Sequence, residues 1–244
     1  MPMNTQQIKN AYRGFLDTLY PRRCFVCDDI APRGSFICEP CKQKLNYVTP
    51  PTCACCGKQV FSARDTLCTD CRHQTKHFTR GYALLNYDEA AQATMVKIKY
   101  KNKPEYIEAL ASLMCERFGE TLNALAPDYL VPVPIDAARL KERGYNQAAL
   151  MASYIGRSLS IPVLDHSLVR SRPTLKQKEL NPEQRLNNLT DAFSVTSLPA
   201  NAEKLVIIDD IYTTGSTAEA CTRALHTAGA KDIYVLCACI GSER

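Results

Sequence analysis

The chain has 244 residues, 45% of them hydrophobic, so it is long enough for one ordinary globular core and a small appendage. It contains no run of about 18 apolar residues, the length that spans a bilayer, and Lys9, Arg13 and Asp17 interrupt the stretch where a signal peptide has its apolar core. The net charge of +5 excludes neither nucleic acid nor small anions as partners, and we expect a cytoplasmic protein without a membrane span.

The first predicted element is a short amphipathic helix within residues 1–23. Ile8, Tyr12, Phe15 and Leu19 recur at helical spacing, and Pro21 ends the pattern. The apolar stripe predicts a helix that docks on another surface.

Cysteines dominate the next segment, residues 24–78. The chain has 13 cysteines, and nine of them lie between Cys24 and Cys71. Without a secretory signal, such a density favours metal binding over disulfides. Eight of the nine form four C-x-x-C pairs, and each pair is a turn that presents two thiolates to a tetrahedral zinc ion. The predicted ligands of two structural zinc ions are Cys24, Cys27, Cys38, Cys41, Cys53, Cys56, Cys68 and Cys71.

The four turns can pair consecutively or in a crossed arrangement. Consecutive pairing closes the shorter loops, so we prefer it, and it makes a small double zinc-ribbon module with Cys55 left over. Each structural zinc would supply on the order of 10 kcal/mol to a segment too small for its own core. Redox chemistry is the alternative for a C-x-x-C turn, although redox dithiols do not usually come in four evenly spaced copies. Residues 1–80 hold 12 Lys and Arg against 6 Asp and Glu, and two tetrathiolate zinc sites would cancel most of this basic surplus.

Residues 79–244 have the pattern of an α/β domain. Strand-like segments at 81–88, 128–134, 161–170, 204–208 and 232–240 alternate with helical patterns at 89–102, 104–122, 136–160 and 216–229. The alternation predicts a parallel sheet covered by helices on both faces. The polar stretch between Ser171 and Asp191 is too long for a plain connection and is expected to be a functional loop.

One segment of this domain, VIIDDIYTTGST at residues 206–217, joins two acids to a hydroxyl-rich loop. Free backbone N–H groups at the start of a helix bind anions, and the side chains of this loop add donors. The lysine of a Walker motif is absent, which argues against a nucleoside triphosphatase. Carboxylates accept hydrogen bonds from vicinal diols, so acids beside a phosphate cradle predict a ribose 5-phosphate ligand. The candidates are Asp209 and Asp210 for the ribose, and Thr213, Thr214, Gly215, Ser216 and Thr217 for the 5-phosphate.

The same segment resembles the phosphoribosyl pyrophosphate (PRPP) motif of type I phosphoribosyltransferases. Four further features resemble the ComF (ComFC/GntX) family of competence-associated proteins: the C-x-x-C turns, KIKY at 97–100, VPVP at 131–134 and RGYNQ at 143–147. The position often occupied by phenylalanine in that family is Tyr145 here. The resemblance implies a type I phosphoribosyltransferase-like sheet flanked by helices, PRPP with magnesium as ligand, and DNA-uptake proteins as partners.

Further candidate residues surround this motif. In type I transferases the turn after the early strand contacts pyrophosphate, which implies a role for Pro134, and the RGYNQ element adds Arg143, Asn146 and Gln147. The long polar loop offers Lys176, Gln177 and Arg185 as residues of a lid. The lysine series Lys97, Lys99, Lys101 and Lys103 is a candidate contact for DNA, with plain solvation as its alternative.

Three functions follow from these observations. The first is a PRPP-binding protein of natural transformation that binds single-stranded DNA, which the zinc ribbons and the basic stretches favour. The second is a metabolic phosphoribosyltransferase that uses PRPP and magnesium with an unknown acceptor, which the pocket alone favours. The third is a regulator that only senses PRPP. The sequence contains no element that identifies a base-recognition hood, so it leaves enzymatic activity open.

Overall fold

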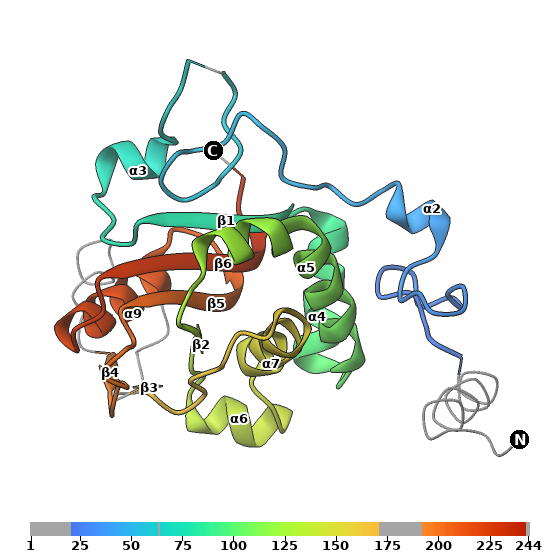
Figure 1. Cartoon of the computed structure of the whole chain (residues 1–244). Helices are drawn as coiled ribbons and strands as arrows, with labels where there is room; N and C mark the ends of the chain where they lie inside the picture. Colours follow the sequence, from blue (N-terminus) through green and yellow to red (C-terminus); the bar gives the residue numbers. More distant parts are fainter. Residues whose placement is uncertain (1–20, 63, 171–191, 243–244) are drawn as a thin grey trace, which may run out of the picture. The chain divides into compact units, whose positions relative to one another are not determined.

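The computed structural model describes residues 21–62, 64–170 and 192–242 (Figure 1). Its helices are α2 (Glu39–Lys42), α3 (Thr69–His73), α4 (Glu89–Tyr100), α5 (Glu105–Leu125), α6 (Ala137–Arg143), α7 (Gln147–Leu159) and α9 (Ser216–Thr227). Its strands are β1 (Arg80–Asn86), β2 (Tyr129–Pro132), β3 (Leu168–Arg170), β4 (Phe193–Val195), β5 (Lys204–Tyr212) and β6 (Asp232–Ile240). The helix expected within residues 1–23 lies almost wholly outside the described residues.

The chain divides into two compact units, Met1–Leu45 and Asn46–Arg244. The first contains one ribbon with its short helix α2, and the second contains the other ribbon together with the sheet. The boundaries expected from the sequence, at residues 23/24 and 78/79, would keep the two ribbons in one module. The compact units instead separate them, and we now propose that the second ribbon is part of the α/β body.

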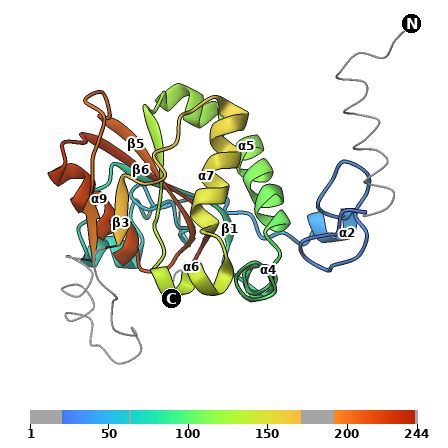
Figure 2. The ribbon, with the colours of Figure 1, turned by 90° about the horizontal axis from the view of Figure 1, so that it is seen from below.

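A four-stranded parallel sheet in the order β1-β6-β5-β2 forms the centre of the second unit. Leu205 and Ile207 of β5 lie in one buried cluster with Cys221 of α9. Val206 and Ile208 alternate to the opposite face and are also fully buried. Helices α5 and α7 lie on the side of the sheet away from α9 (Figure 2). The α/β class with a parallel sheet and flanking helices is therefore confirmed.

The long helix expected over residues 136–160 is in fact two helices, α6 and α7. Gly144 ends α6 in the left-handed region at φ 80°, and Asn146 begins α7 because its side chain accepts a hydrogen bond from the N–H of Ala148. The apolar spacing continues across this break, which is why periodicity alone joined the two helices.

Two strand predictions were also wrong in detail. Residues 161–170 do not add a full strand to the parallel sheet: Val163 makes only an isolated bridge with Leu130, and β3 pairs antiparallel with β4, which was not expected. Strand β5 continues past Ile208 to Tyr212, because Asp209, Ile211 and Tyr212 keep the register with β6. Within the described part of the chain, no helix is long and apolar enough to cross a membrane.

Candidate functional site

The carboxyl end of β5 leads through a short loop directly into α9. Thr213 and Thr214 are exposed, and the hydroxyls of Thr214 and Ser216 lie 2.8 Å apart. Helix α9 begins at Ser216, as predicted, with Gly215 as its N-cap at φ 77° and no side-chain cap on its first N–H groups. These N–H groups carry the positive end of the helix dipole, so the loop has the donors of an anion site.

Only glycine fits at position 215, because the side chain of Tyr212 packs against this part of the loop. A Cβ atom at this position would overlap the hydroxyl of Tyr212, and the positive φ is itself unfavourable for other residues. Tyr212 is 4% exposed, and no described residue accepts a hydrogen bond from its hydroxyl. The buried ring of Tyr212, at the end of β5, thus fixes how closely the loop packs on the strand.

The two adjacent acids lie in the last part of β5. Asp209 accepts a hydrogen bond of 2.8 Å from the N–H of Asp210. Burial, and after it the neighbouring carboxylate of Asp210, raise the pKa of Asp209 to about 7. The raised pKa favours the protonated carboxyl group in the unliganded chain, and a ligand that offers it hydroxyl donors would favour the ionised form.

A lysine from another element balances the second acid. The Nζ atom of Lys99, on α4, lies 2.9 Å from Oδ2 of Asp210, and the two side chains are 19% and 15% exposed. Partial burial strengthens this ion pair relative to a surface pair. The KIKY segment is thus brought to the acids at the end of β5, a contact that the sequence analysis did not predict.

The residues expected on the pyrophosphate side gather near the same end of the sheet. The N–H of Val133 donates to the carbonyl of Ile208, so the turn at Pro134 begins beside Asp209. Arg143 donates from Nη1 to Oε1 of Gln147 at 3.1 Å, and its guanidinium lies 5.4 Å from the ring centroid of Tyr100.

Some buried side-chain donors of the RGYNQ element make no hydrogen bond to the described residues. The Nε of Arg143 and the Nε2 of Gln147 are buried and find no acceptor within residues 21–62, 64–170 and 192–242. Buried donors are normally paired, so these two await a partner. The side chain of Asn146, in contrast, is engaged at both ends, because it caps α7 and donates to the carbonyl of Val133 at 3.0 Å.

The four lysines proposed as DNA contacts do not form one exposed row. Lys97 is 9% exposed, and Lys99 is paired with Asp210. Lys101 is exposed, and the Nζ atom of Lys103 lies 3.5 Å from Oε1 of Glu105. Two of the four therefore point into the fold, and the DNA-contact role stays a prediction, with Lys101 and Lys103 better placed for it. The lid candidates Lys176, Gln177 and Arg185 lie outside the described residues.

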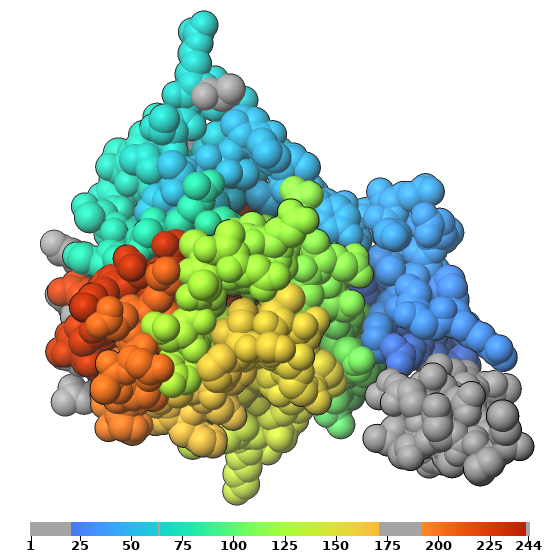
Figure 3. All heavy atoms as spheres, in the orientation of Figure 1, coloured from blue at the N-terminus to red at the C-terminus, as the bar shows by residue number. Residues whose placement is uncertain are grey.

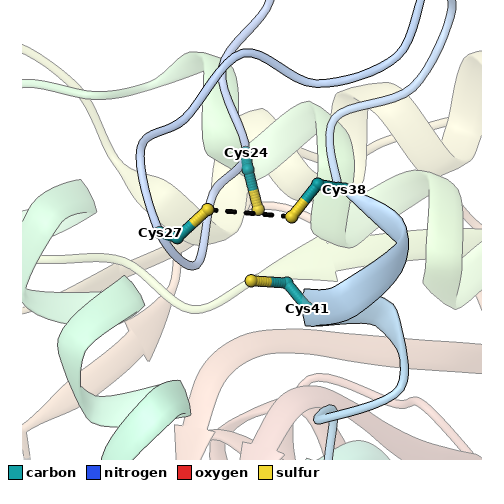
Figure 4. Close-up of side chains that lie close together, drawn as sticks. All are labelled: Cys24, Cys27, Cys38 and Cys41. Atoms are coloured by element: carbon teal, nitrogen blue, oxygen red, sulfur yellow. Dashed lines mark hydrogen bonds between the residues drawn. The ribbon is translucent and has the colours of Figure 1, made fainter.

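The eight paired cysteines converge in two sets of four. In each set the sulfur atoms lie within 4.8 Å of one another, and the sets follow the consecutive pairing, Cys24, Cys27, Cys38 and Cys41, then Cys53, Cys56, Cys68 and Cys71. Figure 4 shows the four sulfur atoms of the first set facing a common centre, with Cys27 and Cys38 3.7 Å apart. Four thiolates at such distances suit tetrahedral zinc, and these are two zinc-binding sites of four cysteines each.

The second ribbon holds the cysteines from Cys53 to Cys71, and the residues that follow Cys71 contact α9 and the loop before it. Lys76 donates to the carbonyl of Thr214 at 3.0 Å. The backbone N–H of His77 donates to Glu219 in the first turn of α9 at 2.9 Å, and its ring contacts the same carboxylate. Phe78 packs edge-on against Tyr212, with centroids 6.3 Å apart. Sequence reasoning missed these residues; the only signal was an acid, Glu219, on the otherwise apolar face of a helix.

Several known proteins are similar to this chain. A double zinc ribbon domain matches residues 15–77. Competence protein F of Haemophilus influenzae is 29% identical over 191 residues, which cover 76% of this chain and 82% of that protein. Competence protein ComFC of Bacillus subtilis is 27% identical, covering 78% and 77%, and the DNA utilization protein YhgH of Escherichia coli K12 is 29% identical, covering 70% and 77%. The resemblance to the ComF family and the double zinc ribbon are thereby confirmed.

Among solved structures, the adenine phosphoribosyltransferase of Leishmania tarentolae matches with a TM-score of 0.37 and 17% identity, covering 65% of this chain and 91% of that one. The corresponding enzyme of Leishmania donovani matches with a TM-score of 0.36 and 18% identity, covering 59% and 68%.

Proposed function

We propose that this chain binds PRPP at the carboxyl end of β5 and acts in the uptake or handling of DNA. The observation that carries the first part is that three features follow one another between β5 and α9. Two acids lie at the end of a buried strand, a glycine packs against Tyr212, and the first N–H groups of α9 have no side-chain cap. Asp209 and Asp210 would accept hydrogen bonds from the ribose hydroxyls, and residues 213–217 would hold the 5-phosphate.

Lys99 fits the same ligand. In the free protein its Nζ atom lies 2.9 Å from Oδ2 of Asp210, which fixes the orientation of that carboxylate. An oriented carboxylate is a better acceptor for a ribose hydroxyl than a mobile one, because less conformational entropy is lost on binding. We assign Lys99 the role of positioning Asp210, in place of a contact with DNA.

The pyrophosphate of PRPP would lie toward α6 and α7. Arg143 and Gln147 each bring a buried donor that lacks an acceptor among the described residues, and phosphate oxygens are acceptors. Arg143 is anchored by Gln147 and by the ring of Tyr100, so its guanidinium is already oriented. Asn146 would act by fixing the start of α7, since both of its amide atoms are engaged.

Magnesium belongs to this ligand as the counter-ion of pyrophosphate. The two carboxylates at the end of β5 are hard oxygen donors of the kind that magnesium prefers, and Lys99 alone does not neutralise both of them. Magnesium would screen the charge of the pyrophosphate beside these acids. The residues of this chain would then hold the ribose, orient the phosphates and exclude water.

The second part of the proposal rests on the relatives, whose names are competence and DNA utilization proteins. We propose that this chain binds single-stranded DNA and works with proteins of DNA uptake. The metabolic alternative, transfer of the phosphoribosyl group to an acceptor, differs in one measurable product, because it releases pyrophosphate.

The test is thermal unfolding of the full chain with PRPP and magnesium. A ligand that binds only the folded state stabilises it by roughly 2.7 kcal/mol at a hundredfold excess over its dissociation constant. We expect a clear rise in melting temperature that Asp209→Ala and Asp210→Ala remove. The control is Asp232→Ala, which replaces an exposed acid at the start of β6 and should leave the rise unchanged. Pyrophosphate release, with and without single-stranded DNA, then separates binding from transfer. An equal rise in all variants contradicts the assignment of the acids.

A further inference from the structure

A pocket lies in the compact unit that contains the sheet, and residues 213–217 are not part of its lining. It has a volume of about 130 Å³ and is formed by the second ribbon, the start of β1 and the middle of α5, with Pro50, Gly57, Arg80, Tyr82, Arg117 and Phe118 among its lining residues. Figure 3 shows the second ribbon and α5 side by side at the surface of the molecule. Arg80 begins β1, whereas Asp210 is near the end of β5, and because the strands are parallel the two lie at opposite ends of the sheet.

The charge of this pocket has one sign. Among the described residues that line it, the side chains charged at neutral pH are Arg80 and Arg117, and none is an acid. Arg117 is held in place, because its Nη2 donates to the carbonyl of Val48 at 3.2 Å. The guanidinium of Arg80 lies 5.5 Å from the ring centroid of Tyr82. Two guanidinium groups in a pocket whose described lining contains no acid favour an anionic ligand such as a phosphodiester.

Two aromatic rings line the same pocket. Tyr82 and Phe118 have centroids 5.9 Å apart and planes inclined at 57°, so the rings do not stack on each other. Both are half-buried. A flat ligand ring can stack on such a face, and a guanidinium over the aromatic ring adds a cation–π contribution.

The pocket is held open by a close contact between the second ribbon and β1. The N–H of Gly81 donates to the carbonyl of Cys55 at 2.7 Å, and a Cβ on either Gly57 or Gly81 would overlap the backbone of the other segment. The ribbon wall of the pocket therefore depends on two glycines and on the cysteine turn Cys53–Cys56. The pocket is a consequence of the way in which the zinc ribbon docks on the sheet.

We propose that this pocket takes one base of a single-stranded DNA, with the neighbouring phosphates on Arg80 and Arg117. Its volume is well below the roughly 300–1,000 Å³ of sites that enclose a whole small molecule, so it suits one flat group of a longer chain. Aromatic side chains in a positively charged groove are the features that proteins use to bind single strands without sequence preference. This inference rests on the proposed DNA-binding function and moves the contact from Lys97–Lys103 to the side chains of β1 and α5 that line this pocket.

The experiment measures binding of a fluorescent oligo-dT of about 12 nucleotides to the full chain by anisotropy, at several salt concentrations. Arg80→Gln with Arg117→Gln should reduce the slope of log affinity against log salt by about 1.4, since each phosphate contact on a single strand contributes about 0.7. Tyr82→Leu should weaken binding roughly 5- to 150-fold, the loss expected when one base loses its aromatic partner. Lys101→Gln with Lys103→Gln is the matched control and should change the slope less than the arginine pair does.

Cross-linking supplies a readout that does not depend on the variants. Irradiation of the wild-type chain with an oligonucleotide that carries 5-iodo-deoxyuridine should attach it to the peptide that contains Tyr82 or Phe118. A slope carried by the lysine pair, or a cross-link confined to other peptides, overturns the pocket and leaves DNA binding intact. Absence of any binding by the wild-type chain at low salt overturns the DNA-binding function itself, and the inference with it.

Discussion

The Nζ atom of Lys99 lies 2.9 Å from Oδ2 of Asp210, and this ion pair joins α4 to the carboxyl end of β5. It connects two motifs that are far apart in the sequence, KIKY and VIIDDIYTTGST. Because both side chains are more than four-fifths buried, removal of either partner would leave the other partly buried without its ion pair.

The first prediction concerns this pair. Lys99→Met should destabilise the chain by about 1–3 kcal/mol, because it leaves the carboxylate of Asp210 partly buried and unpaired. Asp210→Asn should cost a similar amount, and the double variant should cost less than the sum of the two. Urea unfolding of the four proteins measures the coupling. Strictly additive effects would show that the pair contributes nothing.

The second prediction concerns the pH dependence of stability. Asp209 has a pKa of about 7 in the folded chain against an ordinary value of 3.8, so between these values the folded state binds a proton that the unfolded state has lost. Stability therefore falls as the pH rises from about 4 to about 7. Asp209→Asn removes this loss, so it should stabilise the unliganded chain more at pH 8 than at pH 5, by a difference of about 3 kcal/mol. A gain of equal size at both pH values would contradict the raised pKa.

The third prediction separates the two zinc sites. Cys41 and Cys71 hold equivalent positions, but only Cys71 belongs to the buried cluster that contains the sheet. Cys71→Ser should lower the unfolding midpoint of the α/β body and abolish the shift by PRPP, because Lys76, His77 and Phe78 follow it and contact the loop and α9. Cys41→Ser should leave both unchanged. Zinc analysis of each variant checks that one ion has been lost, and equal effects of the two substitutions contradict the distinction.

The fourth prediction compares two glycines with nearly the same backbone conformation. Gly144 at φ 80° has open space around its Cβ position, so Gly144→Ala should cost only the strain of that conformation, about 1 kcal/mol. At Gly215 an added Cβ would also overlap Tyr212, so Gly215→Ala should cost at least about 1 kcal/mol more and should weaken PRPP binding. Unfolding and binding measurements on both variants test this. Equal costs would mean that Tyr212 does not support the loop.

Local patterns in the sequence predicted the parts of the fold that depend on local chemistry. The C-x-x-C spacing predicted both zinc sites and their consecutive pairing, because a tetrahedral site with short loops leaves few alternatives. The start of α9 after Gly215 was also predicted, since a hydroxyl-rich loop after an apolar strand marks a helix start.

What the sequence did not reveal depends on contacts between distant segments. Nothing near Lys99 indicates that Asp210 is its partner, and nothing near His77 indicates Glu219. The division of the chain into compact units at Leu45 likewise has no local signal in the sequence, because the close packing of Gly57 on Gly81 is a tertiary contact. The break between α6 and α7 is a local signal, Gly144 followed by Asn146, that the longer apolar periodicity concealed.

The most direct test of the PRPP site is isothermal titration of the full chain with PRPP in the presence of magnesium. We predict binding of about one PRPP per chain to the wild type and to the control Asp232→Asn, and at least roughly tenfold weaker binding to Asp210→Asn, in line with the loss of a charge-assisted hydrogen bond of about 1.5–3 kcal/mol. Binding to Asp210→Asn with unchanged affinity, or no binding to the wild type, would contradict the placement of PRPP at the end of β5.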